Sequence, residues 1–525
     1  MTTIQDPGDL TDVDLADADF AGVDPADVPF LRTPAPLEVP TAAGRTKPDA
    51  NPWSAAAPAP ARAAGPGSPF GDLTPAAEGV IRLGPPVDWG LVQLLRTRVS
   101  ERLSHVVSTA SPAMSARDKE QAGKDIIVDL IGEHVADQVA SGRPRPTAPA
   151  QQGLARAAFD MVFRLGRLQP LIEDDRVENI LVFGHDRVIL ELTDGTLVPG
   201  LAVADSDEEL VEFVSFLSSR SESSARAFSE ASPELHLRLD DGSRLTAIAW
   251  VTPRPQLRIR RHRLVVVDLD DLVRLDLMPR LAAGFLAAAV RQGLSIVVSG
   301  SPGSGKTTVV RGLCAEIDPD EQIVTAESEA ELFLQERLPY VLPIEARQGT
   351  GEYGPDGRQA GEYTLMQAVM AAVRLNVQRT IVGEVRGPEA LPLLLGMQNG
   401  TGSISTTHAR DAGAVIPKLV NCAQTAGPQY SHATLTDAFA ATIDLVVHLQ
   451  MKVVRGPDGT KKRVRRVAEI VAVEPGDSPG TPATTHVFKA GPDGVLRPHV
   501  LPDPLRVLAT DGFDLAAFTA EQEVS

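Results

Sequence analysis

The chain has 525 residues, a formal net charge of −19 and an isoelectric point near 5.0. That length exceeds what one hydrophobic core supports, so we expect about three folded units. The acidic balance argues against a general nucleic-acid binder, whose affinity would rest on a basic surface, and we expect no direct nucleic-acid partner. The two cysteines, Cys314 and Cys422, exclude a disulfide framework and fit a reduced, cytoplasmic compartment.

The sequence predicts neither a signal peptide nor a membrane span. The N-terminus is acidic and lacks the basic and then apolar start of a signal peptide. No run of about 18 uncharged apolar residues occurs, and the longest candidate, 281–298, is interrupted by Arg291 and Gln292. We therefore expect a cytoplasmic protein whose association with the cell membrane is peripheral.

Residues 1–85 are predicted to be a disordered tail, acidic and rich in Pro and Ala. The first 30 residues contain eight Asp and no Lys or Arg, and apolar clusters are too few to offset the ordering entropy. A five-residue rhythm through Leu10, Leu15 and Phe20 leaves a pentapeptide-type coil open, although so few turns do not make a stable solenoid. The acidic run is either a solvating tail or an interaction tail.

Residues 86–167 are predicted to form a helical bundle. Apolar residues recur at three- and four-residue spacing in three stretches, and a Pro-rich break at 142–149 separates the second stretch from the third. The stretches carry Trp89, Val92, Leu95, Val99, Leu103 and Val106, then Ile127, Leu130, Ile131 and Val135, then Phe159, Val162 and Leu165.

Residues 168–265 are predicted to be a smaller α/β domain. A helix is expected at 206–219, where Ser206 and Glu209 have the spacing of a capping box. The turn Asp240-Asp241-Gly242 between two apolar runs indicates a hairpin. The expected strands are 179–183, 187–192, 235–239 and 245–250, followed by a basic alternating run at 256–263.

The rest of the chain is predicted to be a linker, a large α/β domain and a tail. Residues 266–278 are acidic and leucine-bearing, which we interpret as the linker. Helix and strand patterns alternate from 279 onward and indicate a parallel sheet covered by helices on both faces. We place this domain at 279–475. Two strand-like runs are expected near the end of the chain, at 463–473 and 485–489, and the tail at 476–525 is otherwise expected to be irregular.

The strongest motif is G-x-x-x-x-G-K-[ST] at 300–307, between an expected strand and an expected helix. Glycines let backbone N–H groups curl around phosphate oxygens, and the helix N-terminus adds its positive end. Lys306 would neutralise charge on the phosphates of ATP, and Thr307 would bind Mg²⁺. The predicted nucleotide-binding residues are Gly300, Ser301, Pro302, Gly303, Ser304, Gly305, Lys306, Thr307 and Thr308.

Three polar groups follow other expected strands of this domain. Glu384 comes just after the buried run 381–382, where its carboxylate could meet Mg²⁺ through water or act on the attacking water. His408 ends the next strand-like run and could sense the γ-phosphate, although a lone His is more often structural. The acidic cluster at 327–332, headed by Glu327, either orients water at Mg²⁺ or is solvated.

In order and spacing, these motifs resemble the ATPase family of type II secretion, type IV pili and type IV secretion, nearest its CpaF/TadA branch. The resemblance covers roughly residues 87–475. It implies a RecA-like P-loop NTPase domain and a homo-oligomer, a hexameric ring. It also implies an ATP hydrolase that uses Mg²⁺ and works with inner-membrane platform proteins to power pilus assembly or protein secretion.

The resemblance also implies roles for single residues. Glu384 would be the general base and would hold Mg²⁺ through water, and His408 would report the nucleotide state. Glu327, or Glu329 through local adjustment, would supply the carboxylate of the acidic box. Arginines of the smaller domain would reach the nucleotide, because a guanidinium offsets the charge that builds on the γ-phosphate. The candidates are Arg260 and Arg244, with Arg238 third.

Three departures from the family pattern bear on turnover. The second position of the acidic box is Ser328 rather than an acid, 374–378 reads Arg-Leu-Asn-Val-Gln, and the loop at 398–403 is shorter than usual and lacks an Asp. Two alternatives therefore stay open. One is a conjugative type IV secretion ATPase, and the other is a ring that binds ATP as a scaffold without significant turnover.

A basic segment at 452–466 carries seven Lys or Arg around Pro457-Asp458-Gly459. The segment is predicted to be a solvated hairpin. The alternative is that it docks on a membrane platform or an anionic lipid surface.

Overall fold

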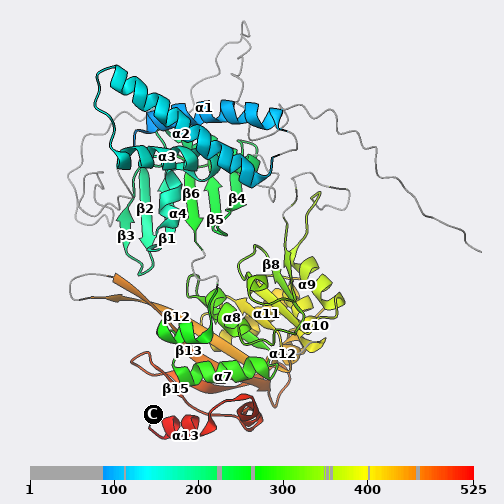
Figure 1. Cartoon of the computed structure of the whole chain (residues 1–525). Coiled ribbons are helices and arrows are strands. Elements are labelled where there is room, and N and C mark those ends of the chain that lie inside the picture. Colours follow the sequence, from blue (N-terminus) through cyan, green and yellow to red (C-terminus); the bar gives the residue numbers. More distant parts are fainter. Residues whose placement is uncertain are drawn as a thin grey trace, which may run out of the picture.

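A computed structural model gives the fold of the chain (Figure 1). The structure describes residues 87–110, 114–220, 228–261, 266–347, 349, 354, 359–399, 402–427, 429–456 and 461–524. The tail predicted at 1–85 and the turn predicted at 457–459 lie outside the described residues.

Three helices form the bundle at the N-terminal end of the described chain (Figure 1). They are α1 (Trp89–Thr109), α2 (Ala116–Ala140) and α3 (Ala148–Phe163). Each begins at a side chain that accepts a backbone N–H of the first turn, namely Asp88, Ser115 and Thr147. Their apolar stripes pack into one small core that includes Leu95, Val99, Ile127, Leu130 and Ala158.

The smaller domain is a six-stranded antiparallel sheet with the order β3-β2-β1-β6-β5-β4. The strands are β1 (Val177–Phe183), β2 (Arg187–Leu192), β3 (Leu197–Pro199), β4 (Glu234–Arg238), β5 (Arg244–Ile248) and β6 (Gln256–Arg260). Helices α4 (Gln169–Glu173) and α5 (Asp207–Arg220) belong to the same domain, and their apolar residues join the sheet in one core. Gly242, with φ +81°, turns the β4–β5 hairpin.

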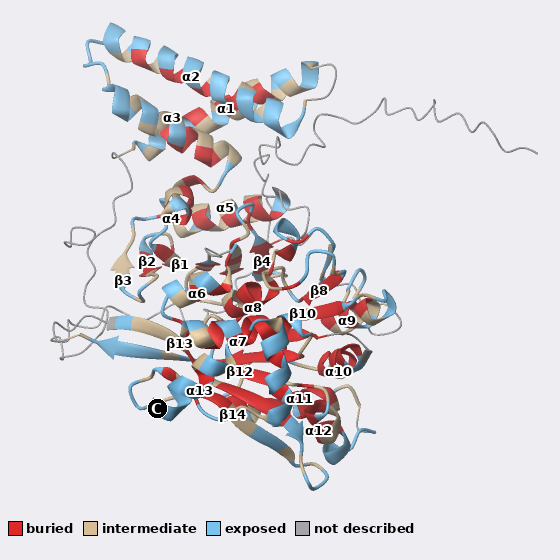
Figure 2. Cartoon of the chain, turned by 60° about the horizontal axis from the view of Figure 1, so that its bottom comes forward, coloured by how far each residue is buried: buried red, intermediate tan, exposed pale blue. Residues whose placement is uncertain are grey.

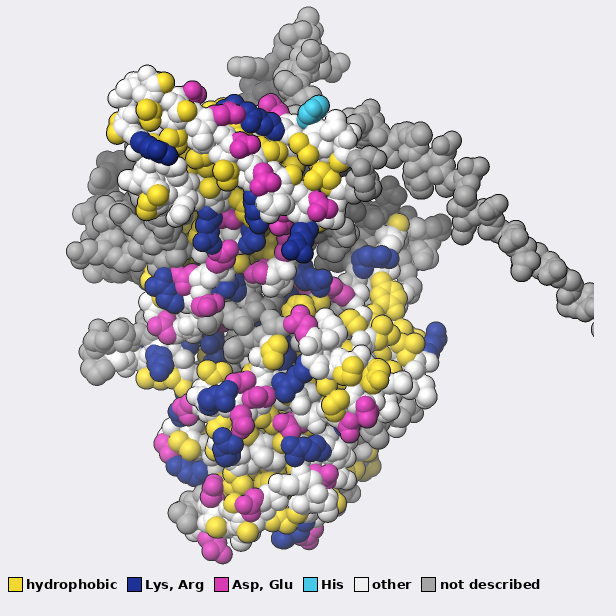
Figure 3. All heavy atoms as spheres, viewed as in Figure 1, with side chains coloured by type: hydrophobic (Ala, Val, Ile, Leu, Met, Phe, Trp, Pro, Cys, Tyr) yellow, Lys and Arg dark blue, Asp and Glu magenta, His cyan; other side chains and the backbone are white. Residues whose placement is uncertain are grey.

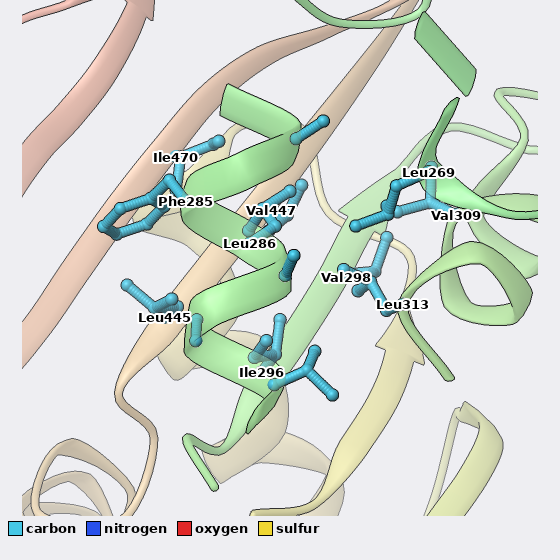
Figure 4. Packing of buried hydrophobic residues seen from close by; sticks show 14 of the residues in the cluster. Leu269, Phe285, Leu286, Ile296, Val298, Val309, Leu313, Leu445, Val447 and Ile470 are labelled. Atoms are coloured by element: carbon cyan, nitrogen blue, oxygen red, sulfur yellow. The ribbon is translucent and has the colours of Figure 1, made fainter. Parts of the chain in front are cut away.

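The segment predicted as a linker is instead part of the large domain. It contains the short helix α6 (Leu269–Arg274), which begins at a capping box between Asp268 and Asp271. Leu269, Leu272 and Met278 are buried in the same core as the P-loop strand, and Leu269 lies beside Val309 (Figure 4). The prediction was wrong because the leucines, spaced for a buried helical face, outweigh the acidic residues between them.

The large domain is built on a nine-stranded sheet with the order β15-β14-β13-β12-β7-β11-β10-β8-β9. The six strands from β12 to β9 are parallel, as predicted, and β13 to β15 add antiparallel strands at one side. The strands are β7 (Ile296–Gly300), β8 (Ile323–Glu327), β9 (Val341–Glu345), β10 (Arg379–Val385), β11 (Ile404–Thr407), β12 (Leu445–Arg455), β13 (Lys461–Pro475), β14 (Pro482–Ala490) and β15 (Leu496–Pro498).

Helices cover both faces of this sheet. On one face lie α7 (Arg280–Arg291) and α8 (Lys306–Cys314), whose apolar residues pack on Ile296 and Val298 of β7 (Figure 4). The opposite face, which includes Val297, is covered by α9 (Leu365–Arg374), α10 (Ala390–Asn399), α11 (Val415–Gln424) and α12 (His432–Ala440). The central strands are consequently buried along their length (Figure 2), which explains their continuous apolar runs.

The tail predicted as irregular at 476–525 is folded onto the large domain. Strands β14 and β15 extend its sheet, and the chain ends with a 3-10 helix (Asp503–Asp511) and α13 (Leu515–Val524). Phe488, Phe513 and Phe518 are buried against one another and around Phe285 of α7, with edge-on ring contacts of 5.2–5.8 Å. The prediction missed this because three aromatic anchors, far apart among Pro and Gly, show no periodicity.

Hydrophobic side chains gather on the surface of the region labelled β8 and α9 in Figure 1, as the space-filling view shows (Figure 3). The exposed large apolar residues on β9, α9, α10 and their ends are Tyr340, Leu342, Met370, Leu375 and Leu395. Across the described ranges, no helix has the length and apolar character needed to cross a membrane.

Candidate functional site

Four parallel neighbours of the large sheet end at one edge. Strands β7, β11, β10 and β8 run in the same direction, so the residues at their carboxyl ends meet there. This places Gly300, Glu327, Glu384 and His408 along a single line of strand ends. The predicted order of motifs therefore becomes a spatial cluster.

The P-loop has the backbone that its glycines permit. Gly303 and Gly305 are in the left-handed region, with φ of +74° and +96°, and α8 begins at Lys306 directly after them. At Gly300 an added Cβ would lie 2.6 Å from the carbonyl oxygen of Leu449, on β12. A side chain here would push the loop off its neighbouring strand, so the close turn requires glycine.

Lys306 is held over the loop by three acceptors. Its Nζ donates to the carbonyl oxygens of Gly300 at 3.3 Å and Ser301 at 3.2 Å, and lies 3.1 Å from Nδ1 of His408. Burial lowers the pKa of Lys306 to about 8; the charge of Glu384 opposes this shift and that of Arg260 adds to it. The ammonium is therefore poorly solvated and suited to an anion.

Glu384 is bracketed by two basic groups. Nε2 of His408 lies 2.8 Å from its Oε1, and Arg386 donates to its Oε2 at 2.6 Å. Burial alone would raise the pKa of Glu384, but the hydrogen bond and charge of Arg386, together with the charge of Lys306, hold the pKa below its usual value. The carboxylate is thus ionised at neutral pH.

Glu327 does not supply the carboxylate that was predicted to face the nucleotide edge. It is buried, packs against Gly383 of β10, and accepts the backbone N–H groups of Glu331 and Leu332. Burial raises its pKa to about 7. Its position at the end of the fully buried strand β8 turns it inward, where it shapes the loop that follows.

Glu331, four residues later, is the acid that reaches the P-loop. Its Oε2 accepts the hydroxyl proton of Thr307 at 2.9 Å, and its Oε1 lies 2.7 Å from Nη1 of Arg244. Ser328, where the motif departs from the family pattern, is exposed. The sequence predicts a role for the acidic cluster at 327–332 but does not single out Glu331, although this residue ends the acidic run just before buried Leu332.

The smaller domain contributes two of the three candidate arginines to the site. Arg244 pairs with Glu329 and Glu331, and Arg260 lines the same cleft as the P-loop. Arg238 instead pairs with Glu345, at 3.3 Å, and does not line the cleft. Whether Arg260 and Arg244 act on the nucleotide stays a prediction.

The cleft has a volume of about 940 Å³ and lies between the two domains. Two lining residues that sequence reasoning left out of the site are Arg386 and Arg465. Arg386 could have been found, because it lies two residues after Glu384. Arg465 lies in the basic segment at 452–466, but nothing in the sequence of that segment points to the P-loop. The lining residues on the P-loop and α8 are Pro302, Gly303, Gly305, Lys306, Thr307, Thr308 and Arg311.

These residues fit a magnesium nucleotide. A glycine-built loop opens a helix, a poorly solvated ammonium lies over it, and Ser304 Oγ is buried without a partner among the described atoms. The hydroxyl of Thr307 and the carboxylates of Glu331 and Glu384 are hard oxygen donors of the kind Mg²⁺ prefers. Phosphate and metal would thus meet complementary groups.

Comparison with known proteins identifies relatives. Residues 239–498 match the family described as Type II/IV secretion system protein. A Mycobacterium tuberculosis protein named for conjugal transfer is 29% identical over 317 residues, which are 59% of this chain and 84% of that protein. PtlH, a type IV secretion system protein of Bordetella pertussis, is 35% identical over 183 residues, 34% of this chain and 51% of PtlH.

Solved structures of the same group are also similar. The VirB11 ATPase of the Brucella suis type IV secretion system is 23% identical over 61% of this chain and 96% of that chain, with a TM-score of 0.29. The Legionella pneumophila ATPase DotB is 17% identical over 59% of this chain and 81% of that chain, with a TM-score of 0.41.

Proposed function

We propose that this chain, whose residues 239–498 belong to the family of type II/IV secretion system proteins, hydrolyses ATP to drive a secretion or pilus-assembly machine. The observation that carries the proposal is the contact chain from the P-loop to the strand ends. Lys306 contacts His408, His408 faces Glu384, and Thr307 contacts Glu331. A phosphate-binding lysine, an ionised carboxylate and a metal-binding hydroxyl are thereby held within one cleft.

The residues divide the chemistry between them. Backbone N–H groups of 303–306 and the ammonium of Lys306 bind and orient the phosphates. Glu384, ionised and held in place by His408 and Arg386, accepts a proton from the attacking water. The water oxygen bonds to the γ-phosphorus while the bond from that phosphorus to the β–γ bridging oxygen breaks, so ADP leaves with the electron pair and phosphate is released. Bound Mg²⁺ would neutralise charge on the phosphate oxygens, held by the hydroxyl of Thr307 and, through water, by Glu331 and Glu384.

Arginines of the smaller domain complete the charge balance. The γ-phosphate gains negative charge in the transition state, and Arg260 and Arg244 lie on the opposite wall of the cleft. Closure of the two domains would bring these guanidinium groups onto the nucleotide and expel water. Turnover is then coupled to the relative position of the domains, which is what a motor requires.

We propose a homo-oligomer, a hexameric ring, as the working form. The exposed apolar residues on β9, α9 and α10 support a protein–protein contact on that side, because monomers rarely leave such side chains clustered in water. The ring would act at the cytoplasmic face of the cell membrane as a peripheral partner of inner-membrane platform proteins.

The machine it drives has two candidates. The motif pattern favours a tight-adherence or type IV-like pilus, whereas relatives named for conjugal transfer and type IV secretion favour a conjugative or protein-secretion ATPase. The scaffold alternative, which Ser328 motivates, is weakened because Glu331 brings a carboxylate to Thr307.

Steady-state ATPase activity against protein concentration tests the proposal. We expect phosphate release that rises more steeply than linearly with protein concentration, because assembly is required. Glu384→Gln, which keeps the shape of the side chain, serves as the inactive control. If the oligomeric wild-type protein binds nucleotide but does not hydrolyse it, the chain is instead a scaffold ring that binds ATP without turnover.

A further inference from the structure

The basic segment singled out in the sequence is not simply a solvated hairpin. Strands β12 and β13 pair from Leu445–Ala472 out to Arg455–Lys461 and extend beside the smaller domain (Figures 1 and 2). Lys452, Arg455 and Lys462 are exposed. Its other described basic side chains, on β13, turn toward acidic partners outside the hairpin, so the hairpin joins parts of the chain.

Three arginines of β13 make these contacts. Arg463 pairs with Glu191 of β2, and its backbone N–H donates to the carbonyl oxygen of Asp194 at 2.8 Å. Arg466 pairs with Asp276, after α6. Arg465, between them, reaches both the smaller domain and the P-loop.

Arg465 bridges two elements that carry the proposed chemistry. Its Nε donates to the carbonyl oxygen of Gly303 at 2.8 Å, and its Nη2 lies 2.9 and 3.0 Å from the carboxylate oxygens of Glu178. About three quarters of each charged side chain is shielded from solvent. A shielded guanidinium with two separate acceptors is held more firmly than an exposed surface pair.

Glu178 in turn borders the strand of Arg260. The carbonyl oxygen of Glu178 accepts the backbone N–H of Arg261 at 3.1 Å, and Asn179 is paired with Arg260 across β1 and β6. A continuous path therefore runs from Gly303 through Arg465 and Glu178 to the backbone beside Arg260.

We propose that Arg465 is a positioning residue that ties the P-loop to β1 and β6 and so holds Arg260 at the phosphate end of the cleft. This inference rests on the proposed function in one respect, namely that Arg260 takes part in ATP hydrolysis. Through this tie, a shift of the P-loop on nucleotide binding moves the smaller domain, and a shift of that domain moves Arg260 relative to Lys306.

A double-mutant cycle tests the proposal on the full chain. We expect Arg465→Ala to lower kcat about tenfold in the wild-type background and less than about twofold in an Arg260→Ala background, because a positioning residue loses its effect when the positioned group is gone. Arg455→Ala removes the same charge from the exposed end of the hairpin and is the matched control, with kcat unchanged. Glu178→Ala should reproduce Arg465→Ala and add nothing to it.

Binding measurements separate positioning from mere support of the loop. Equilibrium affinity for a fluorescent ATP analogue should change less than about threefold in Arg465→Ala, while kcat falls. If the affinity falls by the same factor as kcat, or if Arg465→Ala retains its full effect without Arg260, the proposal is overturned. If Arg465→Ala does not fold, Arg465→Lys replaces it, and the same changes in kcat and affinity are expected. The compact ammonium of lysine lacks the planar guanidinium geometry that lets one side chain bind both partners.

A turnover-independent readout keeps the two hypotheses apart. Hydrogen exchange at the amide of Arg261 should quicken in Arg465→Ala, because its acceptor strand is released. Faster exchange with no effect of Arg260→Ala on kcat would leave the tie standing and refute the role of Arg260. Unchanged exchange would refute the tie, whatever Arg260 does.

Discussion

Nζ of Lys306 lies 3.1 Å from Nδ1 of His408. An ammonium can only donate, so Nδ1 accepts and the ring proton is on Nε2, the atom that faces Glu384 at 2.8 Å. Lys306 also donates to Gly300, whose carbonyl oxygen lies 3.1 Å from the same Nδ1, so the ammonium bridges both acceptors. The P-loop lysine thereby sets the tautomer of the histidine beside the proposed base.

Lys306→Ala and Glu384→Gln should separate binding from turnover. Removing the ammonium takes away the charge that meets the phosphates, so we expect nucleotide affinity to fall at least about a hundredfold. Glu384→Gln keeps the shape but cannot take a proton, so affinity should hold while kcat falls roughly 10²–10⁴-fold. Equilibrium binding beside phosphate release measures both. Hydrolysis by Glu384→Gln at the wild-type rate would rule out this base.

Nucleotide affinity should depend on pH above neutrality. The pKa of Lys306 is about 8 in the free protein, and bound phosphates favour its charged form and raise that pKa. Binding above pH 8 therefore takes up a proton, and affinity should weaken up to about tenfold for each further pH unit, but stay level below about pH 7. Calorimetry in buffers of different ionisation enthalpy measures the proton uptake directly.

Lys306→Arg is the matched control for that titration. A guanidinium remains charged throughout this range, so whatever affinity the variant retains should not vary between pH 7 and pH 9. A wild-type affinity that stays flat up to pH 9.5 would show that Lys306 is fully charged before the nucleotide arrives.

Glu331 should govern the magnesium dependence. In Glu331→Ala, Thr307 loses its acceptor and Arg244 one of its two acids, so the Mg²⁺ concentration for half-maximal turnover should rise about 10–100-fold. Nucleotide affinity measured in EDTA should change little. Ser328→Ala alters an exposed neighbour and is the control. If Ser328→Ala raises the Mg²⁺ requirement and Glu331→Ala does not, the residue that governs Mg²⁺ is at position 328, where the family usually has an acid, and not at Glu331.

The sequence predicts what is local in this site and misses what is distant. Strand, loop and helix around Lys306 follow from a contiguous motif, and parallel strand order then brings Glu384 and His408 to it. Arg465, by contrast, lies 162 residues from Gly303 and 287 from Glu178. No periodicity or spacing encodes such pairs, because they arise only when segments far apart in the sequence pack together.

The same distinction explains the inward turn of Glu327. Because Glu327 ends a strand, the sequence predicts that its side chain lies at the nucleotide edge of the sheet. In the structure, β8 is buried along its whole length, and the loop that follows it covers the Glu327 carboxyl group. A Cβ added to Gly383 would lie 2.9 Å from its Cγ, so the glycine of the neighbouring strand provides the space for this carboxyl group. That coupling between β8 and β10 could not be read from either motif alone.

Glu327→Gln should change how stability varies with pH. Burial, with the nearby charge of Glu331, raises the pKa of Glu327 to about 7 from a usual 4.5. The folded chain therefore keeps a proton that the unfolded chain releases between these values, so this contribution is complete below pH 4.5 and is lost as pH rises through 7. The size of this contribution is about 3 kcal/mol over that pH range.

The glutamine of Glu327→Gln still accepts the N–H groups of Glu331 and Leu332 but cannot ionise. The Tm of Glu327→Gln, relative to wild type, should thus rise by several degrees between pH 5.5 and pH 8 in nucleotide-free protein. The exposed Glu101→Gln should show no such trend, and a constant difference in Tm for Glu327→Gln would mean that the two backbone N–H groups keep Glu327 ionised in the folded chain.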